Sequence, residues 1–161
     1  MKRLFNRVNN RELKARLEQS KEQRITLSFY KYHQLEDPQA FRDDLYLKLS
    51  ECGVLGRIYV ANEGINGQMS VPTEQFDNFK TTLYGIHWLD GVRLNIAVEK
   101  EGKSFFKLAI KVRKKIVADG LNDETFDVTK RGKHLRAPEV NALLDDPETI
   151  VVDMRNHYES E

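Results

Sequence analysis

Positively charged side chains recur at every second position late in the chain. Lys111, Arg113 and Lys115 alternate with apolar or other residues, and Lys107 lies in the same phase four positions earlier. In an extended strand such positions share one face. A row of ammonium and guanidinium groups can hold the phosphate backbone of RNA. These four residues are therefore candidates for RNA binding.

Aromatic side chains add a second chemistry. Tyr30 and Tyr32 lie on the polar side of an alternating stretch, and Arg57 and Tyr59 share one side of another. A sheet face that carries aromatic and basic residues is how some small α+β domains stack single-stranded bases. The alternative stays open that this face is simply solvated, since lysine is common on exposed strands.

A third candidate is the stretch Asn-Glu-Gly-Ile-Asn-Gly at residues 62–67. Backbone N–H groups of a glycine-rich loop bind phosphate, and Arg57 and an asparagine supply the other residue types that phosphate chemistry needs. The carboxylate of Glu63 would repel phosphate. Autonomous phosphatase chemistry is thus a weaker alternative.

The number and spacing of the cysteine and histidine residues do not indicate a metal site or a reactive thiol. The chain has one cysteine, Cys52, and four widely separated histidines, so neither a disulfide nor a metal site is expected. Cys52 falls on an apolar helical stripe, which predicts a buried core residue and not a reactive thiol.

Composition sets the broad class. The chain has 161 residues, of which 40% are hydrophobic and 32% charged, with a net charge of +1. No apolar run approaches the roughly 18 residues of a membrane span. We expect a cytoplasmic protein without a membrane partner. Charge is uneven, because residues 103–136 carry ten Lys and Arg against four Asp and Glu, whereas residues 137–161 carry one against seven.

The periodicity predicts the elements that position these residues. Strands are expected at 25–32, 55–61, 68–71 and 93–98, with a further alternating run at 106–117. Asp37 and Pro38 begin a helix that ends before Gly53, and Thr73 is expected to cap a second helix. The order β-α-β-β-α-β predicts a ferredoxin-like, acylphosphatase-like α+β domain.

Four regions follow from these patterns. Residues 1–24 form a helical extension that contains one short helix, and residues 25–118 form the ferredoxin-like domain. Residues 119–136 are a polar linker, and residues 137–161 begin a second domain with a helix and then an apolar strand at 149–154. Because a lone buried strand needs neighbours, we expect this segment to be disordered, loosely docked, or in contact with another chain.

The end of the chain, Ile-Val-Val-Asp-Met-Arg-Asn-His-Tyr-Glu, resembles the beginning of a rhodanese domain, with Asp153, Arg155 and Glu159 at the motif positions. Together with the stretches at 57–72 and 111–120, the whole chain resembles the N-terminal part of the rhodanese-containing tRNA uridine hydroxylases. That family converts the wobble uridine of certain tRNAs to 5-hydroxyuridine.

The resemblance implies tRNA as the partner, with no DNA, and molecular oxygen as a co-substrate without a bound cofactor. The active cysteine of the family is expected beyond Glu161, so this chain alone is predicted to be inactive. Asp153, Arg155 and Glu159 are then expected to be structural, through ion pairs and backbone hydrogen bonds. A rhodanese-type sulfurtransferase remains an alternative, because the residues present do not determine the reaction.

Overall fold

The computed structural model describes residues 4–6, 8–98, 105–116, 130 and 132–152. The chain divides into two compact units, residues 1–129 and residues 130–161, and each is described by itself. Among the described residues, no helix has the length and apolar character needed to cross a membrane.

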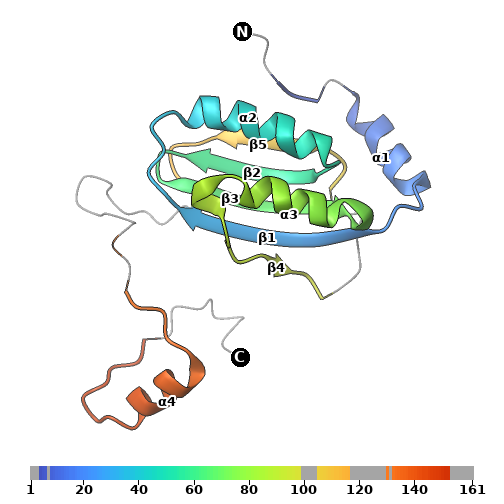
Figure 1. Cartoon of the computed structure of the whole chain (residues 1–161). Helices are drawn as coiled ribbons and strands as arrows, with labels where there is room; N and C mark the ends of the chain where they lie inside the picture. Colours follow the sequence, from blue (N-terminus) through green and yellow to red (C-terminus); the bar gives the residue numbers. More distant parts are fainter. Residues whose placement is uncertain (1–3, 7, 99–104, 117–129, 131, 153–161) are drawn as a thin grey trace. The chain divides into compact units, whose positions relative to one another are not determined.

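The first unit is built on a five-stranded sheet with the order β4-β1-β3-β2-β5 (Figure 1). Its strands are β1 (Arg24–Tyr32), β2 (Leu55–Ala61), β3 (Gly64–Pro72), β4 (Asn95–Ile96) and β5 (Leu108–Val112). The first four form antiparallel pairs in the arrangement of a ferredoxin-like domain, and β5 adds to the edge parallel to β2. The predicted fold class is therefore confirmed.

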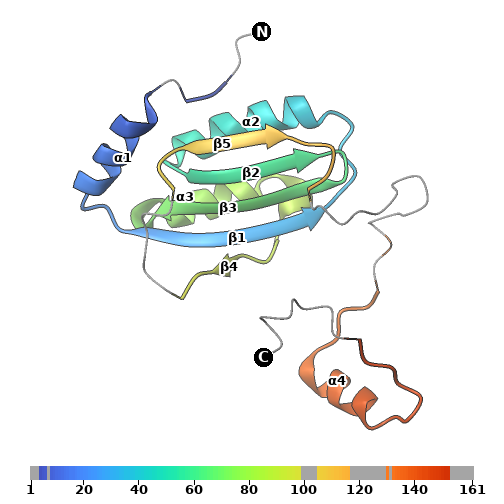
Figure 2. The ribbon, with the colours of Figure 1, turned by 180° about the vertical axis from the view of Figure 1, so that it is seen from behind.

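Two helices cover one face of this sheet. They are α2 (Pro38–Glu51) and α3 (Phe76–Tyr84), whereas none of the helices described in this unit lies on the face turned toward the viewer in Figure 2. As predicted, Asp37 caps α2, because its Oδ1 accepts from the backbone N–H groups of Gln39 and Ala40. We call the uncovered side of the sheet the open face.

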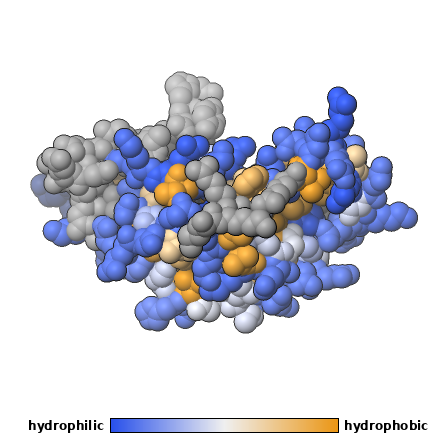
Figure 3. Space-filling model, turned by 90° about the horizontal axis from the view of Figure 1, so that it is seen from above, coloured by the Kyte–Doolittle hydropathy of each residue, from blue (hydrophilic) through white to orange (hydrophobic). Residues whose placement is uncertain are grey.

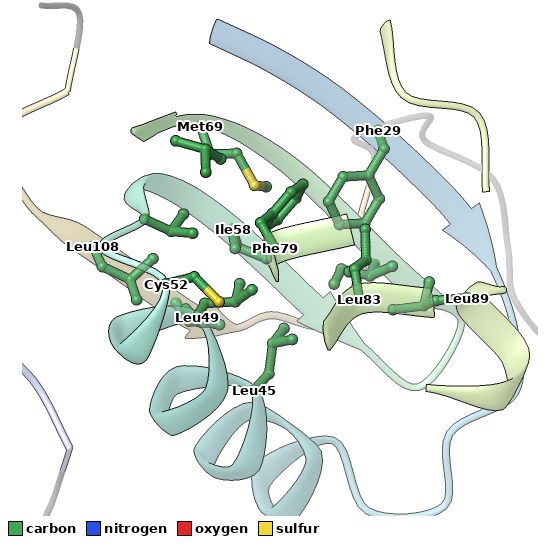
Figure 4. Packing of buried hydrophobic residues seen from close by; sticks show 14 of the residues in the cluster. Phe29, Leu45, Leu49, Cys52, Ile58, Met69, Phe79, Leu83, Leu89 and Leu108 are labelled. Carbon is green, nitrogen blue, oxygen red and sulfur yellow. The ribbon is translucent and has the colours of Figure 1, made fainter. Parts of the chain in front are cut away.

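The core lies between the helices and the sheet. Its side chains come from both layers and point toward one another (Figure 4), and they include Phe29, Leu45, Leu49, Ile58, Met69, Phe79 and Leu83. Cys52 is 1% exposed within this cluster, which confirms its predicted place in the core. On β1 the buried Leu27 and Phe29 alternate with the exposed or half-buried Ser28 and Tyr30. The alternation that predicted the strand therefore also defines its two faces.

The hairpin between β2 and β3 is tighter than predicted. The stretch 62–67 is not a loop, because only Asn62 and Glu63 form the turn and β3 begins at Gly64. Gly64 has a φ of 142°, and a Cβ placed on it would lie 2.1 Å from the carbonyl oxygen of Lys31. Glycine is needed here because β1 and β3 approach closely.

The predicted cap of the second helix is wrong. Thr73 starts a 3-10 turn, η1 (Thr73–Gln75), and its hydroxyl donates to the carbonyl of Gln23 and not to the helix. The α-helix α3 begins only at Phe76, without a side-chain cap. Thr73 therefore ties the start of β1 to the end of β3.

Two strands are shorter than predicted. The expected strand 93–98 reduces to the two residues of β4. Ile96 pairs with Leu27 and therefore lies on the core side of the sheet, but it is 54% exposed, and Val98, which lies beyond the strand, is 97% exposed. The physical reason is that β4 is an edge strand that pairs with only Leu27 and Ser28 of β1. The run 106–117 likewise forms a strand only from Leu108 to Val112.

Helix α1 (Asn10–Gln19) agrees with the predicted N-terminal helix, although it has no buried residue. A second 3-10 turn, η2 (His87–Leu89), follows α3 and places Leu89 in the core. The face of the molecule seen in Figure 3 is mostly hydrophilic, with small and separate hydrophobic patches.

The second unit contains α4 (Ala137–Leu144), as predicted, with Glu139 accepting a hydrogen bond from the backbone N–H of Arg136. The predicted strand at 149–154 is not found in its described part, where Ile150, Val151 and Val152 are exposed. No strand among the described residues pairs with them. Asp153, Arg155 and Glu159, and residues 119–129 and 131 of the predicted linker, lie outside the described residues.

Candidate nucleic-acid interface

The strand register places four of the eight predicted residues, Tyr30, Tyr59, Lys111 and Arg57, in two neighbouring rows on the open face. One row runs across four strands and consists of Tyr30, Asn66, Tyr59 and Lys111. The next row consists of Ser28, Gln68, Arg57 and Ala109. None of the strand positions that the structure describes on this face carries a carboxylate. The rows combine aromatic rings, amides and cations without an opposing negative charge.

Tyr30 and Tyr32 lie next to each other at the end of β1. Their ring centroids are 6.3 Å apart with an interplanar angle of 76°, which is an edge-to-face contact. Tyr30 is 57% exposed, whereas Tyr32 is half-buried. Of the two rings, Tyr30 is therefore the more accessible surface for stacking.

Tyr59, Lys111 and Arg113 meet at the carboxyl end of β2 and β5. Lys111 is the direct neighbour of Tyr59 in the parallel register, and the guanidinium of Arg113 lies 5.6 Å from the centroid of the Tyr59 ring. The backbone N–H of Arg113 donates to the carbonyl of Val60 at 2.8 Å, so the pairing continues one residue beyond the strand. The structure thus brings three of the predicted residues together.

The chain then crosses the open face. We call residues 113–116 the strap, which leaves β5 and passes over the ends of β2 and β3 (Figure 2). Glu63 Oε1 accepts from the backbone N–H of Ile116 at 2.7 Å, and Asn66 Nδ2 donates to the carbonyl of Ile116 at 3.2 Å. Ile116 is 4% exposed. Both backbone groups of one residue are therefore held by side chains from the β2–β3 hairpin.

An open groove of about 950 Å³ lies beside the strap, lined by Tyr59, Asn62, Val112, Arg113, Lys114, Lys115 and Ile116. Lys114 is exposed and Lys115 half-buried. Three consecutive basic residues therefore line one groove, which is a positive site for a polyanion. Because the strand ends at Val112, Lys115 reaches this groove from the strap and not from the strand face on which it was predicted.

Lys107 lies apart from this group. It precedes β5, its Nζ donates to Asn10 Oδ1 at 3.0 Å, and the same nitrogen lies 5.6 Å from the centroid of the Phe106 ring. Lys14 of α1 approaches that ring at 5.3 Å. Lys107 therefore belongs to the contact between α1 and the start of β5.

The polar side chains of residues 62–67 have other partners. Glu63 and Asn66 hold Ile116, and Asn62 Nδ2 donates to the carbonyl of Leu35 at 3.0 Å. This engagement weighs against a phosphate cradle at residues 62–67. Sequence reasoning missed the role of Glu63 and Asn66; the one signal was that Glu63 is the only carboxylate in residues 55–72.

Comparison with known proteins is consistent with this architecture. The family described as UPF0176 acylphosphatase like domain matches residues 24–116. The chain belongs to this family. The match begins at the first residue of β1 and ends at Ile116, the residue that the hairpin holds, so the UPF0176 acylphosphatase-like domain includes the strap.

Longer relatives share nearly the whole chain. Proteins named tRNA uridine(34) hydroxylase from Pectobacterium carotovorum, Erwinia tasmaniensis and Yersinia enterocolitica are 58%, 57% and 55% identical to it over 98% of its length. The chain spans 45% of the length of these relatives. The similarity thus includes the second unit as well as the UPF0176 domain.

Proposed function

We propose that this chain is part of a tRNA uridine(34) hydroxylase and that its UPF0176 domain helps to hold the tRNA. The observation that carries the proposal is the identity of 55–58% with relatives of that name across 98% of the chain. Identity at this level over both units supports a shared activity for the whole protein. The proposed reaction takes place on tRNA in the cytoplasm.

The catalytic part of this proposal lies outside the chain. We assign the reaction to a rhodanese domain that continues beyond Glu161 and bears an active cysteine, with molecular oxygen as co-substrate. The exposed Ile150, Val151 and Val152 support this assignment, because an apolar stretch of that kind needs neighbouring strands to cover it. Asp153 and Arg155 would then stabilise the loop that follows the strand.

The tRNA contact is proposed at the groove beside the strap. Lys111 and Lys114 are exposed, Lys115 lines the groove, and Arg113 lies over Tyr59 with its guanidinium edge available for hydrogen bonds. Lysine and arginine side chains placed along a groove bind phosphate oxygens without recognising the base sequence. The domain would therefore position the tRNA backbone while another part of the protein receives the base.

Binding of unmodified tRNA to the chain across a series of salt concentrations tests this role. The affinity should fall with salt, with a logarithmic slope of about −0.7 for each phosphate contact on a single strand. Replacing Lys111, Arg113 and Lys115 together by Glu should abolish binding. The melting temperature should change little through Lys111 and Arg113, since exposed charge changes usually cost less than about 0.5 kcal/mol each, and somewhat more through the half-buried Lys115.

A matched control is Arg93→Glu, which changes an exposed charge near β4 at the opposite edge of the sheet. This variant should keep nearly the full affinity. If tRNA binding survived the triple replacement, the groove would not be the site. The contact would then lie outside the chain or in residues 1–36, which carry nine Lys and Arg against four Asp and Glu.

A further inference from the structure

Only part of the open face is accessible. The exposed positions on its strands are Tyr30, Gln68, Arg57 and Lys111, together with Asn95 on the edge strand β4, and the strap crosses the neighbouring end of the sheet. Gln68 is directly opposite Arg57 and one row from Tyr30 in the register. Adjacent strands are about 4.8 Å apart, so Tyr30 on β1 and Arg57 on β2 are separated by about 10 Å across the sheet, with Gln68 on β3 between them. One nucleotide together with the long Arg57 side chain can span this separation.

The three side chains differ in chemistry and are ready to bind. The Tyr30 ring makes an edge-to-face contact with Tyr32, and Tyr30 is still 57% exposed, so part of its surface is accessible for stacking. The side chains of Gln68 and Arg57 form no hydrogen bond or ion pair with any residue that the structure describes. An amide offers both a donor and an acceptor, and a guanidinium offers a fork of donors that suits a phosphate.

We call Tyr30, Gln68, Arg57 and Lys111 the patch, and its net charge indicates which class of ligand can bind there. Arg57 and Lys111 are its two cations, and no described strand position on the open face carries a carboxylate. An anionic ligand with a flat ring satisfies all of these groups at once. The strap limits the patch on one side, so a single unpaired nucleotide fits it better than a duplex, whose bases are stacked and paired.

We propose that this patch binds one unpaired nucleotide of an RNA strand. The base stacks on Tyr30, its hydrogen-bonding edge meets the Gln68 amide, and a phosphate next to it binds Arg57. This inference rests on the proposed function and extends it, because it assigns base recognition to the sheet and leaves backbone binding to the groove beside the strap.

Titration of the chain with a short, fluorescently labelled, single-stranded oligoribonucleotide tests the proposal. Tyr30→Leu should weaken binding about tenfold, because a stacked base contributes at that level, whereas Tyr30→Phe should stay within about twofold. Neither change should alter the salt slope, since neither removes a charge. Arg57→Gln should instead reduce the slope by about 0.7.

Gln68→Ala should weaken binding several-fold and reduce the difference in affinity between oligonucleotides that differ in one base. The matched control is Gln34→Ala, which removes an exposed amide in the loop after β1 and should have no effect. Equal affinities for the wild type, Tyr30→Leu and Gln68→Ala would overturn the nucleotide site.

Failure of this inference is distinguishable from failure of the proposed function. If the triple Glu variant abolished tRNA binding while Tyr30→Leu had no effect on the oligonucleotide, backbone binding at the groove would stand and the nucleotide site would be wrong. If Tyr30→Leu weakened oligonucleotide binding and the triple variant still bound tRNA, the groove would be wrong and the nucleotide site would stand.

Discussion

At the scale of single residues, Glu63 is the most informative side chain. It is a buried carboxylate at a hairpin turn, and it accepts the backbone N–H of a residue that lies far away in the sequence. A buried N–H group without a partner costs free energy, so this contact satisfies Ile116 at the point where the chain crosses the sheet. Glu63 is thereby a structural residue of the strap.

Replacing Glu63 by Ala should destabilise the strap. We expect a loss of about 1–3 kcal/mol in the free energy of unfolding, because the N–H of Ile116 is left without its acceptor. Glu63→Gln should cost less, since its side-chain carbonyl still accepts the same hydrogen bond. Urea denaturation measures the loss, and hydrogen exchange of the Ile116 amide measures its location. Unchanged protection of that amide in Glu63→Ala would contradict the role.

At the scale of elements, the β2–β3 hairpin organises the candidate site. Its turn supplies Glu63, β3 supplies Asn66 and Gln68, and β2 supplies Arg57 and Tyr59. The same hairpin pairs with β1 and β5 on its two sides. Its tightness depends on Gly64, where the backbone conformation and the nearby Lys31 carbonyl both exclude a side chain. A substitution that changes the shape of this turn would therefore disturb every row of the open face.

Gly64→Ala should lower the free energy of unfolding by about 3 kcal/mol or more, because the new Cβ combines backbone strain with a clash against the main chain. The matched control is Gly91→Ala, since Gly91 also has a positive φ, of 65°, but has open space around its Cβ position. That variant should lose about 1 kcal/mol. Equal losses in the two variants, measured by thermal or urea unfolding, would show that close packing at Gly64 is unimportant.

At the scale of the whole molecule, the proposed division assigns the binding of tRNA to the UPF0176 domain and its modification to another part of the protein. The first unit provides the sheet, the groove and the strap, whereas the second provides α4 and an apolar stretch whose side chains are exposed. The relatives named tRNA uridine(34) hydroxylase are more than twice as long as this chain. We therefore place the reaction in the part of the protein that this chain does not contain.

The chain by itself should form no 5-hydroxyuridine in unmodified tRNA and should not transfer sulfur from thiosulfate. A protein of the relatives' full length should hydroxylate the same tRNA in the presence of oxygen. Mass spectrometry of digested tRNA measures the first activity, and thiocyanate formation measures the second. Hydroxylation by this chain alone would place the catalytic groups within residues 1–161 and would refute the proposed division.

The sequence by itself determined the elements whose signals are local. Alternation predicted β1 and β2, Asp37 and Pro38 marked the start of α2, and apolar spacing placed Cys52 in the core. These features depend on residues only a few positions apart, and together they were sufficient to predict the ferredoxin-like order of elements. The end of β5 could not be predicted, because the alternation of charged residues continues after the pairing stops.

Only the tertiary structure decided which candidates share a site. Lys107 and Arg113 have the same phase in the sequence, yet one contacts α1 and the other lies over Tyr59. The strap depends on contacts that Glu63 and Asn66 make with Ile116, which lies 53 and 50 positions after them in the sequence. No local pattern encodes such a contact, because it forms only after the register of β1, β2, β3 and β5 has brought these residues together.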